Sequence, residues 1–124
     1  MASTTETTPT SAGSSGARGY LVKWDWWAFP GVWAFDADVG TEGALADDAP
    51  LSDDLLGQLS RWVSDGDVQG RGDATAIDDE LIDWNRRGRS LAARVRAEVP
   101  DDIPVWWFDE LTGERHPVPS PDRR

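Results

Sequence analysis

The sequence predicts an α+β domain, in which a small antiparallel or mixed sheet of three to four strands carries two helices on one face. Runs of aromatic and β-branched residues lie near both ends of residues 19–118. Between these runs, two segments have apolar residues at spacings of three and four, the period of a helix. The predicted order of elements is therefore strand, strand, helix, helix, strand and a short final strand.

Residues 19–29 and 32–35 are expected to form the first two strands, because they are rich in Trp, Phe and Val. Pro30-Gly31 between them predicts a turn, so that the two strands form a hairpin. Alternation along a strand places tryptophan side chains on both faces of this hairpin. Only one face can meet the helices, so the other must be covered or left partly open.

Residues 36–50 contain mostly Asp, Gly, Ala and Pro, and they are expected to form a loop. Ser52 then predicts the start of a helix, because its hydroxyl can accept from free backbone N–H groups. Asp53 and Asp54 suit the positive end of the helix dipole, and Gly66 predicts the end of the helix. The apolar stripe of this helix consists of Leu55, Leu59, Trp62 and Val63.

Residues 76–99 are predicted to form the longer helix, opened by a capping box of Thr75 and Asp78. Acidic residues fill its first half and arginines its second half, an order that complements the helix dipole. Asp83 is expected to pair with Arg87 one turn later, and the arginines are expected to form a solvated, self-paired face.

Gly88 falls within the apolar stripe of this second helix, where it weakens the helix unless a neighbour needs the space. A tryptophan ring from the sheet is the expected neighbour. Residues 103–108 (Ile-Pro-Val-Trp-Trp-Phe) predict a third strand, and residues 115–118 predict a brief return strand.

The chain is expected to hold a single domain at residues 19–118. Residues 1–18 are dominated by Ser, Thr and Gly, so they are expected to form a disordered tail, and residues 119–124 are expected to be disordered as well. Neither a secretory signal nor a membrane-spanning stretch is recognisable, and the chain has no cysteine. A cytoplasmic protein that does not contact a membrane is the expected class.

Negative charge is concentrated in the first half of the chain. The net charge is −11, and residues 19–60 hold one lysine against eight acidic residues. Direct binding to nucleic acid is disfavoured, because no segment has an excess of positive charge with which to neutralise phosphates. Three explanations of the charge remain: solubility, attraction to a basic protein, or imitation of a polyanion.

No motif in the chain predicts catalysis, a cofactor or a metal. Residues 65–73 match part of a calcium loop, but Ala76 stands where that loop needs a bidentate Glu. His116 is the only histidine and is expected to be an exposed turn residue without an orienting partner. Asp25 and Asp109 could line a glycosidase cleft, but such enzymes usually need longer chains. A protein without enzymatic activity is therefore expected.

The eight tryptophans form the strongest signal for function. Trp24, Trp33, Trp62, Trp84 and Trp106 are expected to fill the core. In the pairs Trp26-Trp27 and Trp106-Trp107, one member of each pair must point away from the helices. This remaining aromatic area, bordered by carboxylates, predicts a surface that binds a partner. The residues proposed for this surface are Trp26, Trp27, Trp107, Asp25, Asp36, Asp38, Asp109 and Glu110.

The segment Asp83-Trp-Asn-Arg-Arg-Gly-Arg-Ser-Leu-Ala-Ala-Arg-Val-Arg-Ala-Glu-Val-Pro-Asp-Asp-Ile-Pro-Val-Trp-Trp-Phe-Asp109 resembles the ending of a group of small acidic actinobacterial proteins. Some members of that group resemble the immunity proteins encoded beside polymorphic toxins. The similarity extends over about residues 20–110, although residues 64–75 lack the Asn-Trp-Asp type of segment associated with the group. The shared positions are packing residues, so the resemblance carries over no site residue.

These observations predict an acidic binding protein that occludes a basic site on a protein partner, as an immunity protein or antitoxin-like inhibitor does. In this mechanism the carboxylates steer and pair with the basic site, and outward tryptophans supply the buried anchors. Two alternatives remain open. One is a carbohydrate- or small-ligand-binding module that uses exposed tryptophans, and the other is an inhibitor that mimics DNA.

Overall fold

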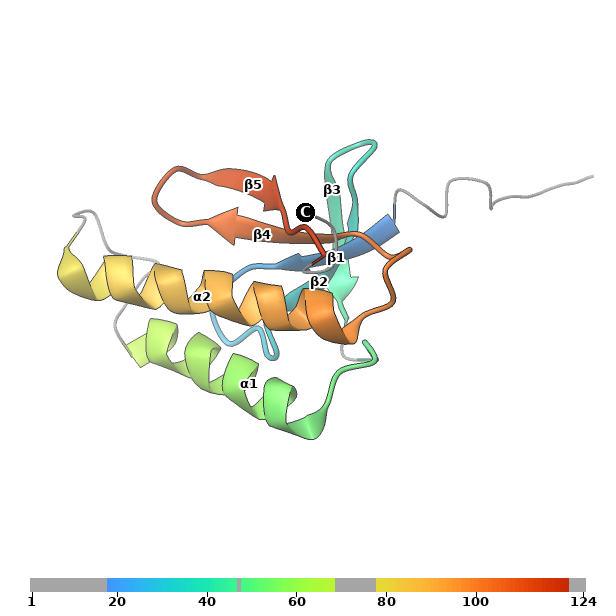
Figure 1. Cartoon of the computed structure of the whole chain (residues 1–124). Helices are drawn as coiled ribbons and strands as arrows, with labels where there is room; N and C mark the ends of the chain where they lie inside the picture. Colours follow the sequence, from blue (N-terminus) through green and yellow to red (C-terminus); the bar gives the residue numbers. More distant parts are fainter. Residues whose placement is uncertain (1–17, 47, 69–77, 121–124) are drawn as a thin grey trace, which may run out of the picture.

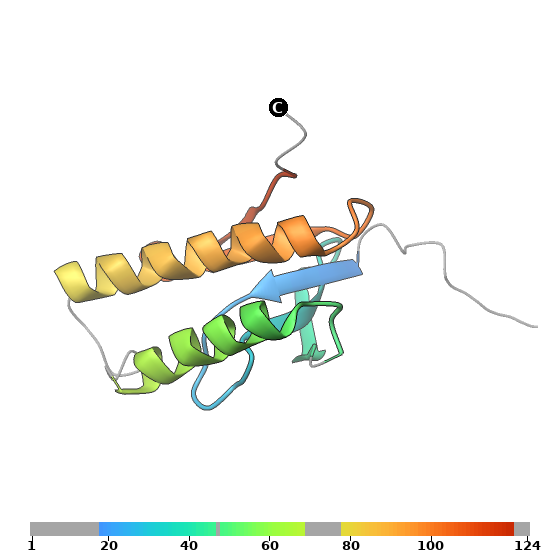
Figure 2. The same cartoon turned by 60° about the horizontal axis from the view of Figure 1, so that its bottom comes forward.

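The computed structural model describes residues 18–46, 48–68 and 78–120. A five-stranded mixed sheet forms one layer, and two helices on one of its faces form the other (Figures 1 and 2). The predicted α+β class is confirmed, with five strands in place of three to four. The elements are β1 (Arg18–Val22), β2 (Val32–Asp36), β3 (Thr41–Leu45), α1 (Asp53–Val68), α2 (Asp79–Glu98), β4 (Val105–Asp109) and β5 (Glu114–Pro117).

β1 is the central strand in the order β3-β2-β1-β4-β5. It pairs antiparallel with β2 and parallel with β4, and Leu21 lies opposite Trp33 on one side and Trp106 on the other. Because β1 and β4 are parallel, their carboxyl ends meet at the same end of the sheet. Two connections therefore lie at that end, residues 23–31 after β1 and residues 110–113 after β4.

The strand predicted at residues 19–29 ends at Val22, and a loop follows it. Trp27 has φ of 54°, a left-handed conformation that is incompatible with a strand. The loop predicted at residues 36–50 contains the strand β3, which pairs with β2 across a register shift. β3 has the sequence Thr-Glu-Gly-Ala-Leu, without the aromatic run that signals a strand, so pairing with β2 rather than local propensity makes it extended.

Both helices begin where a side chain caps them. The Ser52 hydroxyl accepts from the N–H of Leu55 at 3.2 Å, as predicted, and Asp78 accepts from the N–H of Leu81 at 2.8 Å. α2 thus begins three residues later than expected, and Thr75 lies outside the described residues. Gly66 does not end α1, which continues to Val68.

The helices pack through tryptophans where glycines leave room. A Cβ atom at Gly88 would lie 2.6 Å from Cζ2 of Trp62, so the ring that occupies this space comes from α1 and not from the sheet. A Cβ at Gly66 would lie 2.8 Å from Cζ2 of Trp84, which explains a buried glycine inside α1. Trp62 and Trp84 stack at 4.9 Å, and the indole N–H of each donates to the other's carbonyl at 3.0 Å.

The hydrophobic core lies between the sheet and the helices. Trp24, Trp62 and Trp84 are buried there, as predicted. Trp33 and Trp106 are only half-buried, because they lie opposite Leu21 and share the sheet face away from the helices. Among the described helices, none is long and apolar enough to cross a membrane.

Candidate functional site

The loop of residues 23–31 presents the most exposed aromatic side chains of the described chain. Trp27 is 73% exposed, Trp26 38% and Phe29 41%. We call this segment the aromatic loop. It lies beside the second half of α1 (Figure 2), where Gly31 packs against Val63.

Hydrogen bonds and ring packing connect the aromatic loop to α1 and to itself. The N–H of Lys23 donates to the carbonyl of Gly31 at 2.9 Å, and the N–H of Trp27 donates to Oδ1 of Asp67 at 3.3 Å. Trp24 is the buried anchor, because its indole N–H donates to the carbonyl of Val63 at 3.1 Å. Trp26 packs edge-on against Trp24, with ring centroids 5.0 Å apart. The outward rings thus belong to a preorganised loop.

Three carboxylates stand at the same end of the sheet, and we call Asp25, Asp109 and Glu110 the acidic edge. The pKa of Glu110 is raised to about 7, mainly by burial and also by the charges of Asp109 and Asp25, while the charge of Lys23 opposes the rise. These influences place Asp25, Asp109 and Lys23 within electrostatic range of Glu110. The charge of the acidic edge therefore changes near neutral pH.

Asn85 of α2 fixes the end of β4 where the acidic edge begins. It is 4% exposed, its side-chain amide donates to Oδ1 of Asp109 at 3.0 Å, and its oxygen accepts from the N–H of Glu110 at 2.9 Å. Asn85 was not among the residues predicted for a site. A signal was present, since Asn85 follows Leu81 by one helical turn and so occupies the apolar stripe.

The structure brings together five of the eight residues predicted for the binding surface. Trp26, Trp27, Asp25, Asp109 and Glu110 lie at the end of the sheet where β1 and β4 finish. Asp36 and Asp38 do not join them, because the turn between β2 and β3 lies at the opposite end. Trp107 is 8% exposed and belongs to the core, so the prediction of an outward Trp107 is wrong and Trp106 is the outward member of that pair.

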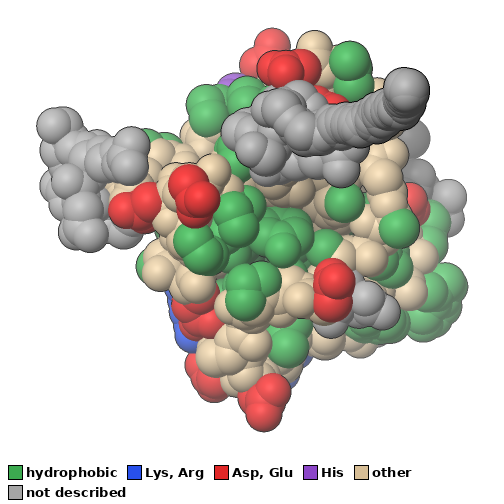
Figure 3. Space-filling model, turned by 90° about the vertical axis from the view of Figure 1, so that its right-hand side faces the viewer, with side chains coloured by type: hydrophobic (Ala, Val, Ile, Leu, Met, Phe, Trp, Pro, Cys, Tyr) green, Lys and Arg blue, Asp and Glu red, His purple; other side chains and the backbone are tan. Residues whose placement is uncertain are grey.

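The opposite end of the molecule has its own apolar area with acidic side chains around it (Figure 3). α1 begins and α2 ends there, as Figure 1 shows. Leu51 and Ile103, which flank these helix ends, are half-buried and pack against the core. No described aromatic side chain at this end is as exposed as Trp27.

Charged side chains pack over aromatic rings on the outer face of the sheet. Nζ of Lys23 lies 5.3 Å from the ring centroid of Phe108, and the Arg115 guanidinium lies 5.4 Å from that of Phe35. Glu42 joins the two cations, at 3.3 Å from Lys23 and 2.6 Å from Arg115. Burial alone would raise the pKa of Glu42, but Arg115 and Lys23 outweigh it and hold the pKa below its ordinary value.

A groove of about 760 Å³ runs between α2 and the β4–β5 hairpin, and we call it the α2–hairpin groove. His116 of β5 lines this groove and is half-exposed. Its Nε2 lies 3.6 Å from Oδ2 of Asp109, a partner that the sequence did not reveal. The indole N–H of Trp107, which also lines the groove, is buried and has no hydrogen-bond partner within the described chain.

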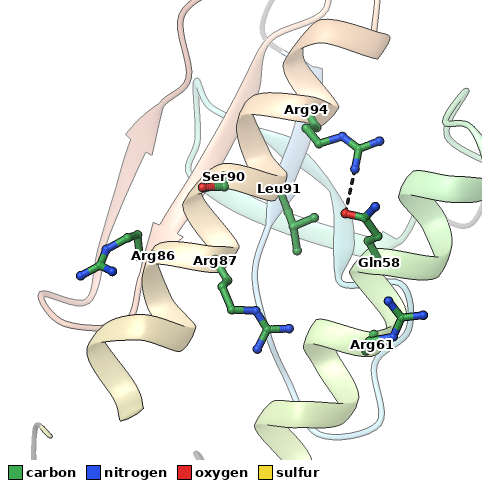
Figure 4. Close-up of a pocket in the computed structure, with 7 residues that line it drawn as sticks. All are labelled: Gln58, Arg61, Arg86, Arg87, Ser90, Leu91 and Arg94. Atoms are coloured by element: carbon green, nitrogen blue, oxygen red, sulfur yellow. Dashed lines mark hydrogen bonds between the residues drawn. The ribbon is translucent and has the colours of Figure 1, made fainter. Parts of the chain in front are cut away.

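A smaller groove of about 290 Å³ lies between the helices and is lined by arginines of both (Figure 4). Arg87 pairs with Asp65 of α1 at 2.8 Å, and Asp83 instead lies 3.5 Å from Arg86, so the predicted Asp83–Arg87 pair is wrong. Arg94 donates to Gln58 at 2.7 Å. The arginine face is therefore paired mainly across the two helices, where packing brings the partners closer than one helical turn does.

The segment with partial likeness to a calcium loop lies mostly outside the described residues. Within residues 18–46, 48–68 and 78–120, no group of three or more His, Cys, Asp or Glu side chains is placed to hold a metal ion. Comparisons of this chain with family models, with curated proteins and with solved structures find no match.

Proposed function

We propose that this protein is a non-enzymatic, cytoplasmic inhibitor of the immunity or antitoxin type, which occludes a basic site on a protein partner. The observation that carries the proposal is the exposure of Trp27, 73%, on an ordered loop next to the acidic edge. Tryptophan is strongly enriched among the residues that dominate binding energy at protein interfaces. Carboxylates beside such an anchor raise the rate of encounter with a basic surface.

The end that holds the aromatic loop is a better candidate than the opposite end. Trp26, Trp27 and Phe29 supply large rigid rings at little entropic cost, because the loop is already ordered by Trp24 and Asp67. At the opposite end, the exposed hydrophobic residue beside Asp36 and Asp38 is the smaller Val39.

The test is affinity capture from a lysate of the source organism with wild type, Trp27→Ala, and two charge variants at pH 8. Asp25→Asn/Glu110→Gln removes two carboxylates from the acidic edge, and Asp36→Asn/Asp38→Asn removes two from the other end. We expect a basic protein to be retained by wild type and by the Asp36/Asp38 variant. Trp27→Ala should weaken its binding by more than about 30-fold, the effect of losing an interface hot spot.

The Asp25/Glu110 variant should slow association several-fold at low salt and leave the dissociation rate nearly unchanged. Inhibition of the captured protein by wild type completes the test. A partner that is not basic, or one that binds Trp27→Ala as tightly as wild type, would contradict the proposal. Quenching of tryptophan fluorescence by soluble glycans, lost in Trp27→Ala, would favour the carbohydrate-binding alternative instead.

A further inference from the structure

The α2–hairpin groove has the size and lining of a small-molecule site, separate from the aromatic loop. Its volume of about 760 Å³ lies within the ~300–1,000 Å³ typical of ligand pockets. Most of its wall is apolar, with a few polar groups among these side chains, as in sites that bury an organic ligand. The apolar lining residues are Ile82, Ala93, Trp107, Leu111, Pro117, Val118 and Pro119.

The polar groups of the groove are mainly donors. Arg89 lines it with its guanidinium 6.0 Å from the Trp107 ring centroid, and the described residues show no carboxylate paired with Arg89. The buried N–H of Trp107 has no acceptor. The one acidic residue of the lining, Asp109, already accepts from Asn85 at 3.0 Å and from the N–H of Leu111 at 2.9 Å through Oδ1, and its Oδ2 lies 3.6 Å from Nε2 of His116. Donors that have no acceptor, next to a carboxylate that already accepts hydrogen bonds, favour a ligand with acceptor groups.

The rings of the groove favour a flat ligand. The ring centroids of Trp107 and His116, which both line the groove, lie 5.9 Å apart with their planes inclined by 32°, so two adjacent rings form part of the wall. Arg89 lies on the same side, where it can pair with a negative group while the ligand's body rests against the rings. A polyanion is disfavoured, because the protein as a whole has a net charge of −11.

From these observations we infer that the α2–hairpin groove binds a small organic anion with a flat apolar body. Arg89 pairs with the anionic group, and the rings of Trp107 and His116 contact the body. This site is additional to the surface proposed for a protein partner, and of that surface's residues it includes only Asp109 and the buried Trp107.

The test uses 1-anilinonaphthalene-8-sulfonate, a fluorescent flat anion, and N-phenyl-1-naphthylamine, which has the same rings without the charge. We expect the sulfonate to bind the full chain at one site, with fluorescence enhancement and an affinity at least about tenfold above that of the neutral compound. Arg89→Gln should weaken the sulfonate about tenfold and leave the neutral compound unchanged. Trp27→Ala should bind as wild type does, which separates this site from the aromatic loop.

Arg61→Gln is the matched control, because Arg61 is an exposed arginine that lines the groove between the helices. It changes the net charge by the same amount as Arg89→Gln, so it should leave the affinity for the sulfonate within about twofold. Equal weakening by both variants, equal affinity for the two compounds, or no binding by folded wild type would overturn the inference. Far-ultraviolet circular dichroism of each variant establishes that it is folded.

Discussion

Glu110 occupies a position that disfavours its ionisation, and this has a consequence for stability. Its pKa in the folded protein is about 7, against an ordinary value of 4.5. Between these two pH values the folded state holds a proton that the unfolded chain releases, so this contribution to stability is complete below pH 4.5 and lost as the pH rises through 7. Glutamine imitates the protonated side chain at every pH.

We therefore expect Glu110→Gln to match wild type at pH 4.5 and to exceed it at pH 8. The gain at pH 8 should be on the order of 1–2 kcal/mol, after the shift is discounted for remaining solvent access. Urea unfolding at the two pH values measures the difference. Asp38→Asn, an exposed carboxylate at the other end of the sheet, should show no such dependence. A difference that stays constant between the two pH values would contradict the assignment.

The two adjacent tryptophans of β4 illustrate what the sequence can determine at the scale of a residue. Alternation requires Trp106 and Trp107 to point to opposite faces, and they do. The sequence does not say which of them faces the helices, because that choice depends on the pairing of Trp106 with Leu21 in β1. The prediction chose the wrong member for this reason.

At the scale of elements, the contact between α1 and α2 depends on Gly88. An alanine there would place its Cβ 2.6 Å from Trp62, in the ring that stacks on Trp84. We expect Gly88→Ala to reduce the free energy of unfolding by about 1–3 kcal/mol through overpacking, even though alanine favours helix. Urea unfolding followed by circular dichroism measures this loss.

Gly57→Ala is the matched control within α1. Its Cβ would meet no atom within 4 Å, so only the helix propensity changes. This variant should be more stable than wild type by about 0.5–1 kcal/mol. Stabilisation of both variants would mean that the stacked tryptophans move aside easily and that Gly88 is not needed for packing.

The helices and the aromatic strands could be predicted because their local signals are strong. Ser52 caps α1 as expected, and the spacing of apolar residues located α2 within three residues of its observed start. β3 has no comparable signal, since its extended backbone depends on β2. The prediction that α1 ends at Gly66 was wrong, because the sequence does not distinguish a glycine that makes room for a tryptophan ring from a glycine that ends a helix.

At the scale of the whole molecule, the candidate site depends on a contact between distant segments. The parallel pairing of β1 with β4 brings Asp25 to the same end as Asp109 and Glu110. The residue types of this surface were predictable from composition, but their grouping was not. Asp36 and Asp38 have the same chemistry as Asp25 and still lie at the far end, because β2, which ends at Asp36, runs antiparallel to β1.

The net charge of −11 leads to a last prediction, on how the whole molecule responds to salt. The described ion pairs lie mostly near the surface, where each contributes little, so salt that weakens them costs little stability. Repulsion among the excess carboxylates acts over longer distances and is screened as the Debye length falls from about 10 Å at 0.1 M to about 3 Å at 1 M. We expect the melting temperature at pH 8 to rise by a few degrees between 0.05 M and 0.5 M sodium chloride.

Differential scanning calorimetry measures this shift, and potassium chloride at the same concentrations should give the same shift if screening is the cause. A melting temperature that falls with salt would mean that the Lys23–Glu42–Arg115 cluster and the ion pairs between the helices outweigh the repulsion.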